Sequence, residues 1–201
     1  MDLVLVRHGS TDADPGLCLG HADLPLSARG FTDIQQLAAS WRGAPPRFLF
    51  ASDLRRAQQT AQIFAAAFAI EPLADARLRE TDFGRWNGRH WTEIVKADSA
   101  RYQHWQDNWV IQEAPDGESF ADVLRRTGAW LAALTGSTAQ DDCVLGVAHA
   151  GSIRALLCHA LGLPPDRALA IAVDEARACR LRCANGQFEV RYMNATRFEG
   201  D

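Results

Sequence analysis

The sequence predicts an α/β fold, a three-layer sandwich in which a mainly parallel mixed sheet has helices on both faces. Short apolar runs such as Leu3-Val4-Leu5-Val6 alternate with segments whose apolar residues recur at helical spacing, and this alternation is typical of parallel sheets. The first run has no polar residue on either face, as expected for a strand covered on both sides. Near the end of the chain, Asn185-Gly186 separates two alternating segments, which indicates a hairpin.

Capping residues and turn residues give approximate bounds for the elements. Ser27 and Asp53 are expected to cap helices, and Ser119 with Asp122 forms a capping-box signature. We expect strands at 2–6, 47–51, 71–74, 143–148, 169–183 and 187–193. We expect helices at 27–41, 53–68, 119–134 and 152–162. Residues 85–115 are the least regular part, and we expect one domain over 1–201 with a small cap-like segment at about 85–115.

Composition excludes several classes of protein. The 201 residues carry a formal net charge of -4 and contain no basic run, which argues against a nucleic-acid partner. The apolar run at the N-terminus is broken at Arg7, so we expect neither a signal peptide nor a membrane span, and a cytoplasmic protein. The five cysteines have no zinc-site spacing, so we expect free thiols, no metal and no cofactor. We expect a monomer or a homodimer.

Three predicted strands end in the same kind of residue. Arg7-His8-Gly9 follows the first strand, Arg55-Arg56 lies shortly after the second, and His149 follows the strand at 143–148. If these strands lie parallel, their carboxyl ends meet at one edge of the sheet, where α/β folds bind ligands. Guanidinium and imidazole groups gathered there predict a phosphate site. The alternative is that each turn carries an unrelated surface charge.

Motifs spread along the chain carry a resemblance to a known family. They are Leu5-Val6-Arg7-His8-Gly9, Gly20-His21 with Pro25-Leu26-Ser27 and Gly30, Ser52 to Ala61, Leu78-Arg79-Glu80 with Phe83-Gly84, Asp116 to Ser119, and His149-Ala150-Gly151 with Ile153-Arg154. Together they resemble the histidine phosphatase superfamily, which is phosphoglycerate-mutase-like in fold, and within it the short bacterial branch that includes alpha-ribazole phosphatase. Two positions depart from the pattern: Ser10 replaces a frequent Glu, and Asp14 replaces the Asn that touches phosphate in the mutases. We therefore leave Asp14 out of the site.

The resemblance implies a role for each main site residue. His8 is the nucleophile, and Arg7, Arg56 and His149 hold the phosphate oxygens. Of the two adjacent arginines, Arg55 is expected to face solvent or a carboxylate. The alternative for His8 is a core histidine bonded only to backbone.

Glu80 is the candidate general acid and base, with Asp82 as its rival. The alternative for Glu80 is an ion pair with Arg77 or Arg79. Further candidates for substrate contacts are Thr11, Gly20, His21 and Gly151.

The tryptophan-rich segment is the place to expect contacts with the rest of a substrate. Tyr102, Trp105 and Trp109 share a helical face. Packing against the body of the protein is the favoured interpretation of this stripe, and a stacking surface for a flat ring is the alternative. Three further residues are expected to meet the non-phosphate part of a substrate: Trp86, Arg89 and His90.

The sequence therefore predicts a phosphomonoester hydrolase that forms a phosphohistidine intermediate on a small phosphorylated metabolite. Alpha-ribazole phosphate, a metabolite of cobalamin biosynthesis, is the candidate substrate implied by the resemblance. One alternative is a cofactor-dependent phosphoglycerate mutase, which is disfavoured because the chain lacks the insertions that resemble a mutase lid. The other is a non-catalytic relative that only binds a phospho-ligand.

Overall fold

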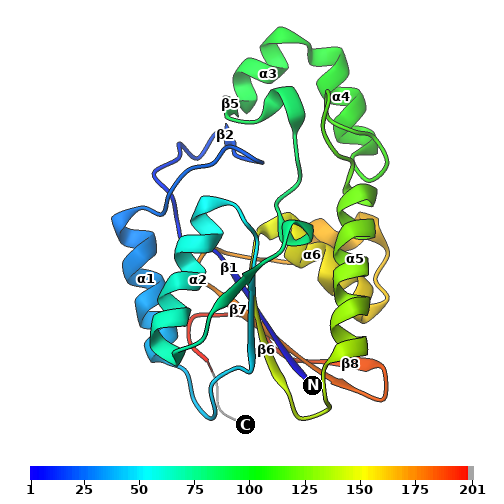
Figure 1. The fold of residues 1–201 in the computed structure, drawn as a ribbon. Helices are drawn as coiled ribbons and strands as arrows, with labels where there is room; N and C mark the ends of the chain where they lie inside the picture. Colours follow the sequence, from blue (N-terminus) through cyan, green and yellow to red (C-terminus); the bar gives the residue numbers. More distant parts are fainter. Residues whose placement is uncertain (199–201) are drawn as a thin grey trace.

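The computed structural model describes residues 1–198 and is built around a six-stranded sheet with the strand order β4-β3-β6-β1-β7-β8 (Figure 1). Its strands are β1 (Asp2–Arg7), β3 (Phe48–Ala51), β4 (Pro72–Ala74), β6 (Cys143–Ala148), β7 (Ala178–Ala184) and β8 (Gln187–Ala195). The pairs β1–β6, β3–β6 and β3–β4 are parallel, whereas β7 pairs antiparallel with both β1 and β8. The predicted mixed, mainly parallel sheet is confirmed.

Helices cover both faces of the sheet, because central strands such as β1 and β6 are apolar on both faces. Val4 and Val6 of β1 belong to a core cluster with residues of α1 (Ala28–Ala39) and α2 (Arg55–Phe68). Leu3 and Leu5 belong to a second cluster with residues of α5 (Phe120–Ser137) and α6 (Ala150–Leu161). Figure 1 shows the two helix pairs on opposite sides of the sheet. Successive residues of β1 therefore supply two separate cores.

Two of the three expected helix caps are present. The Ser27 hydroxyl accepts a hydrogen bond from the Gly30 amide at 2.9 Å, and Ser119 and Asp122 form the capping box of α5. The expected cap at Asp53 is wrong: Leu54 is the N-cap residue of α2 and makes no side-chain cap bond. The Asp53 carboxylate instead accepts two hydrogen bonds from Arg79. A bidentate guanidinium is a stronger partner for a carboxylate than an amide is.

The expected long strand at 169–183 is also corrected. Pro165–Ala170 forms a 3₁₀ turn, and only Ala178–Ala184 is a strand. The connection between them bends back to the edge of the sheet, where the Ala176 amide donates to the carbonyl of His8. Beyond β7, Asn185 and Gly186 both have positive φ, at 52° and 75°, as the predicted tight hairpin requires.

The segment expected to be irregular contains two helices and a strand. These are β5 (Arg89–His90), α3 (Trp91–Ala97) and α4 (Ser99–Asn108), and β5 pairs with β2 (Leu17–Cys18). In Figure 1 they form the upper end of the molecule, beyond the carboxyl ends of the parallel strands. Trp86, only 5% exposed, is the centre of their packing and meets the Trp105 ring edge-on at 5.4 Å. The division into one domain with a cap-like segment stays a prediction.

A search of the helices in the described part of the chain finds none with the length and apolar character needed to cross a membrane.

The capping box gives a test of the fold. Ser119→Ala removes the hydroxyl that accepts from the Asp122 amide, so we expect the free energy of unfolding to fall by about 1 kcal/mol. Ser137→Ala, at the exposed other end of α5, is the control and should change it by less than about 0.5 kcal/mol. Urea denaturation measures both, and equal losses would contradict the assignment of the cap.

Candidate active site

The carboxyl ends of β1 and β6 bring two histidines together. Arg7 is paired with Ala148 in the parallel register, so the next residues of the two strands, His8 and His149, lie beside each other. Their ring centroids are 4.9 Å apart. Both side chains are almost fully buried, at 2% and 0% exposure. This is the edge of the sheet at which the sequence predicts a phosphate site.

The hydrogen bonds of His8 define its tautomer. Its Nδ1 lies 2.8 Å from the carbonyl oxygen of Gly9, which can only accept, so Nδ1 carries the proton. Its Nε2 accepts from Nε of Arg56 at 3.2 Å. Burial and the charges of Arg56 and Arg7 hold the pKa of His8 well below its usual value, against a smaller opposing effect of the Gly9 carbonyl. His8 is therefore an uncharged imidazole with its lone pair at Nε2.

Arg56 lies in the first turn of α2 and is completely buried, whereas Arg55 is exposed. Its two terminal nitrogens donate to the carbonyls of Ala22 at 2.9 Å and Gly20 at 2.7 Å. Gly20 has a φ of +44°, and an added Cβ would lie 2.0 Å from Oδ1 of Asn87. Gly20 thus holds Arg56 through its backbone. The carbonyl bonds fix the guanidinium beside His8.

The imidazole of His149 is held on one side only. Its Nε2 lies 2.8 Å from the hydroxyl of Ser52, while Nδ1 is buried with no hydrogen-bond partner. Burial has the largest effect on the pKa of His149, and the electrostatic effects of His8 and Arg56 act in the same direction. Together they keep this pKa well below its usual value. The sequence analysis assigned no role to Ser52, although it follows β3 directly, as His149 follows β6.

Arg7 also has an unpartnered donor. One terminal nitrogen donates to the Val173 carbonyl at 2.8 Å, and the other lies 3.4 Å from Glu175. Its Nε is buried and unpartnered. Among the described residues, only Asp2 has another buried side-chain polar atom without a partner. The Ser52 hydroxyl accepts from the Leu54 amide and can donate to Nε2 of His149, which leaves the ring proton on Nδ1. Buried donors are normally satisfied, so Nε of Arg7 and this Nδ1 indicate a place for an acceptor such as an oxyanion.

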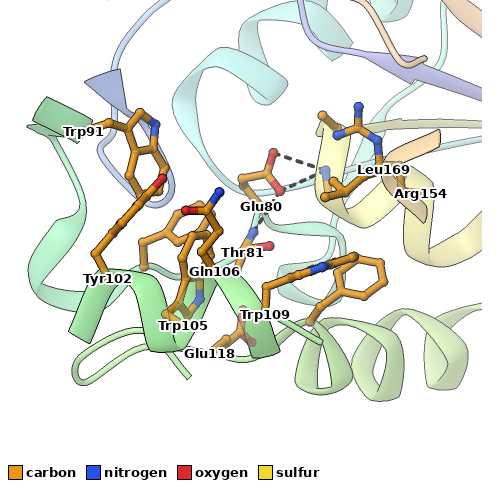
Figure 2. A pocket seen from close by; sticks show the side chains of 14 residues that line it. Glu80, Thr81, Trp91, Tyr102, Trp105, Gln106, Trp109, Glu118, Arg154 and Leu169 are labelled. Carbon is orange, nitrogen blue, oxygen red and sulfur yellow. Dashed lines mark hydrogen bonds between the residues drawn. The ribbon is translucent and has the colours of Figure 1, made fainter. Parts of the chain in front are cut away.

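The carboxylate of Glu80 is held by two backbone amides (Figure 2). Its Oε1 accepts from Thr81 at 2.9 Å and from Gly151 at 3.0 Å. Gly151 is required for this approach, because a Cβ there would lie 2.2 Å from Oε1. Neither neighbouring arginine pairs with Glu80, since Arg77 binds Asp75 and Arg79 binds Asp53. Gly151 thus contacts Glu80.

The rival carboxylate, Asp82, has a different environment. It accepts from the Asn87 side chain at 2.6 Å and from the Gly84 amide at 2.8 Å. Partial burial raises the pKa of Asp82, but these bonds and the nearby His21 outweigh burial and leave the pKa below its usual value. Asp82 is therefore held as a carboxylate and is poorly suited to donate a proton.

The backbone of Glu80 is fixed by two side chains. Its carbonyl oxygen lies 2.8 Å from Nη2 of Arg126 and 2.8 Å from Nε2 of His21. Arg126 also forms two hydrogen bonds with Glu118. His21 thus supports the segment that carries Glu80. The sequence analysis missed Arg126, because its pairing with a segment 46 residues away leaves no local pattern.

Thr11 and Asp14 line a second cavity, which is not the one that Glu80 lines. Thr11 forms an isolated bridge with Leu26 and lines this cavity together with Arg7 and Asp14. Asp14 is exposed, and its carboxylate accepts from the Gly16 amide at 2.9 Å. The carboxylate of Asp14 is therefore hydrogen-bonded to the backbone of its own turn.

A cavity of about 520 Å³ opens beside Glu80 (Figure 2). The residues that line it include Trp91, Tyr102, Trp105, Trp109, Phe120, Arg154 and Leu169. Tyr102 and Trp105 pack around Trp86 and also line this cavity. The stripe therefore has the packing role that was favoured, and it also faces a space where a flat ring could lie. The expectation for Trp86, Arg89 and His90 is not met: none of them lines this cavity. Trp86 is core, and the other two form β5.

Within residues 1–198, no three His, Cys, Asp or Glu side chains are grouped so that they could hold a metal ion. All five cysteines are free thiols.

Comparison with known proteins agrees with this geometry. The family model described as the histidine phosphatase superfamily (branch 1) matches residues 3–196. The chain belongs to this superfamily. Among curated members of the superfamily, the adenosylcobalamin/alpha-ribazole phosphatase of Escherichia coli K12 is 31% identical over 87% of this chain and 86% of its own. A protein named probable phosphoglycerate mutase GpmB, from Citrobacter koseri, is 32% identical over 82% of this chain and 76% of its own.

A solved structure has the same fold. The alpha-ribazole phosphatase from Shigella flexneri superposes with a TM-score of 0.92 at 28% identity, and the match covers 100% of both chains. The predicted family, fold class and class of enzyme, a phosphatase, are confirmed.

The uncharged histidines predict how stability depends on pH. The pKa values of His8 and His149 are lowered in the folded protein, so below pH about 6.5 the unfolded chain binds protons that the folded chain does not. The stabilisation is therefore present above the unfolded pKa and is lost as the pH falls below it. We expect the free energy of unfolding to fall by about 1.4 kcal/mol per pH unit for each histidine.

Urea denaturation between pH 5 and 8 measures this slope. His8→Asn should reduce the slope by about half, since one of the two groups is gone. His104→Asn, at an exposed position on α4, is the control and should leave the slope unchanged. An unchanged slope in His8→Asn would contradict an uncharged His8.

Proposed function

We propose that this phosphatase hydrolyses a small phosphate monoester through a phosphohistidine at His8, and that alpha-ribazole phosphate is its substrate. One observation carries the chemistry. A buried, uncharged imidazole has its lone pair at Nε2 beside a site where Nε of Arg7 and Nδ1 of His149 have no protein partner. A nucleophile and unpartnered donors in one buried place suit a phosphoryl group.

In the first step, Nε2 of His8 attacks phosphorus, forming the N–P bond as the bond to the ester oxygen breaks. Arg7, Arg56 and His149 bind the phosphoryl oxygens and stabilise the charge spread over them in the transition state. Arg56 gives up its hydrogen bond to His8 when the nitrogen attacks, and it keeps its place through the carbonyls of Gly20 and Ala22. The carboxyl group of Glu80, protonated in this step, gives its proton to the leaving alkoxide.

In the second step, the resulting Glu80 carboxylate takes a proton from a water molecule, whose oxygen attacks phosphorus. The N–P bond breaks, and phosphate leaves with His8 again uncharged at Nε2. One carboxyl group serves both steps, because it is left deprotonated by the first. The amides of Thr81 and Gly151 keep its oxygens at the mouth of the cavity, where the leaving group departs and the water enters.

The substrate is argued from the cavity and the relatives. An aromatic-lined cavity beside Glu80 offers a flat ring more contact than it offers a short acid. Relatives of comparable identity are named alpha-ribazole phosphatases and a phosphoglycerate mutase. A mutase, which would return the phosphoryl group to a substrate oxygen, is therefore the second candidate. A non-catalytic relative is disfavoured because both His8 and Glu80 are present and their side chains are held by hydrogen bonds to the backbone.

The nucleophile is tested by His8→Ala. We expect complete loss of turnover and of the acid-labile phosphoenzyme, because no other group can form the N–P bond. His149→Ala should keep the nucleophile but lose about 2.7–4 kcal/mol of transition-state stabilisation, a fall of about 10²–10³-fold in kcat. Trapping with labelled substrate and acid-quenched gels measures the intermediate. Turnover by folded His8→Ala would remove His8 from this role.

The general acid is tested by comparing Glu80→Gln with Asp82→Asn. Glu80→Gln should lower kcat/KM for an alkyl phosphate by about 10²–10⁴-fold. It should lower phosphoenzyme formation from p-nitrophenyl phosphate much less, since that leaving group needs no proton. Asp82→Asn is the matched control and should retain the same leaving-group dependence as the wild type. If instead Asp82→Asn becomes sensitive to the leaving group, the two roles are exchanged.

The substrate is tested by measuring kcat/KM side by side for alpha-ribazole phosphate, p-nitrophenyl phosphate and 3-phosphoglycerate. We expect alpha-ribazole phosphate to be hydrolysed best and 3-phosphoglycerate worst. A preference for 3-phosphoglycerate, with transfer between its oxygens faster than release of phosphate to water, would overturn the proposal in favour of the mutase.

A further inference from the structure

One cation lines the cavity beside Glu80, and the proposed chemistry does not use it. Arg154 lies on α6, five residues after His149, and is the only lysine or arginine among the described residues that form the cavity wall. Figure 2 shows its guanidinium on the same side of Glu80 as Leu169. Arg154 and the carboxylate of Glu80 therefore line the same cavity.

Arg154 is anchored by one hydrogen bond only. Its Nε donates to the carbonyl of Ile171 at 3.0 Å, and its two terminal nitrogens make no hydrogen bond or ion pair with the described residues. The guanidinium of Arg126, on the neighbouring helix α5, makes bonds to Glu118 and to the carbonyls of Arg77 and Glu80. The outer fork of Arg154 is thus free to bind oxygen atoms of a ligand.

The acidic groups of the same wall are already bound. Glu118 is paired with Arg126, and Glu80 accepts from the amides of Thr81 and Gly151. Arg154 is therefore the wall residue with unused charged donors. Burial lowers the pKa of Arg154, and Glu80, Arg7 and Asp174 lie near enough to influence it. Oxygen atoms bound by Arg154 would thus lie in the same cavity as Glu80.

Another part of the cavity wall is apolar. The rings of Trp109 and Phe120 lie 4.9 Å apart, and Leu169 is 62% exposed at the rim. A ring placed on this surface would cover the exposed leucine and contact Trp109. Beside Glu80, the cavity thus offers both free guanidinium donors and an apolar surface.

We propose that Arg154 is a specificity-determining residue that binds a sugar oxygen lying between the phosphate ester and a flat ring, with the ring held against Trp109 and Leu169. This inference rests on the proposed function, whose substrate class it narrows to phosphorylated ribosides of aromatic bases. Charged donors that point into a cavity discriminate strongly, because they are left unpaired when the substrate lacks the matching oxygen.

The test compares two substrates in one variant. The substrates are a benzimidazole riboside 5′-phosphate and p-nitrophenyl phosphate, which has a ring but no sugar. In Arg154→Met, the ratio of kcat/KM for the riboside to kcat/KM for the aryl ester should fall about 10- to 100-fold, the range for a lost charged hydrogen bond. Arg191→Met, on β8, is the matched control and should keep the wild-type ratio.

Two further measurements separate this role from a structural one. Arg154→Lys keeps the charge but not the fork, and its ratio should fall to an intermediate value. Quenching of tryptophan fluorescence by the unphosphorylated riboside measures binding without hydrolysis, and Arg154→Met should weaken this binding about 10-fold or more. Circular dichroism confirms that the variants are folded.

The outcomes distinguish this inference from the proposed chemistry. Equal losses on both substrates, or unchanged riboside binding in Arg154→Met, would overturn the role of Arg154. If Arg154→Met lost kcat/KM only for 3-phosphoglycerate, the proposal that Arg154 binds a sugar oxygen would be overturned, and a substrate carboxylate would take its place. If the wild type hydrolysed no ester but bound the riboside in an Arg154-dependent way, the proposed function would fail while the assignment of Arg154 stood.

Discussion

The parallel pairing of β1 with β6 decides where the two histidines of the active site lie. Because Arg7 is opposite Ala148 in that register, the strand ends place His8 beside His149. The loop that precedes β7 is bonded to the same edge, since the amide of Ala176 donates to the carbonyl of His8. A shift of one residue would turn each strand's side chains to the opposite face. The same register seats Val4 and Val6 against α1 and α2, and Leu3 and Leu5 against α5 and α6. Packing of the two cores therefore also fixes the site.

Burial lowers the pKa of both histidines and of Arg56 at this edge, but it leaves the two kinds of group in different charge states, because a guanidinium starts from a far higher pKa. The histidines lose their charge, because desolvation and neighbouring arginines both disfavour the imidazolium. The arginines keep theirs and are held by backbone carbonyls, those of Gly20 and Ala22 for Arg56 and that of Val173 for Arg7. A carbonyl stabilises a cation without neutralising it, so the charge remains available to an anionic ligand. The site thus contains positive charge and an uncharged imidazole together.

Glu80 lies where two differently built regions meet. On one side is the cationic edge of the sheet, and on the other is a cavity whose aromatic walls include residues from α3, α4 and the start of α5. Gly151 connects the regions, since its amide binds Glu80 and its position in α6 lies two residues after His149. Arg126 and His21 hold the Glu80 carbonyl from the other direction. The carboxylate of Glu80 is thereby held on the wall of the cavity by bonds to elements on both sides.

The sequence by itself determined the mainly parallel sheet, the four helices that cover it and the convergence of His8, Arg56 and His149. Each of these depends on local signals, namely apolar strands with residue types at their ends and periodic helices with caps. Asp53 shows where such signals fail, because a cap residue formed a stronger bond with Arg79, which is distant in sequence. Only the tertiary structure decided that Gly20 and His21 support other site residues, that Trp86 is core while Trp91 and Trp109 line the cavity, and that Arg126 and Ser52 belong to the site. These roles depend on contacts between segments far apart in the chain, and a single sequence carries no periodic or capping pattern for such contacts.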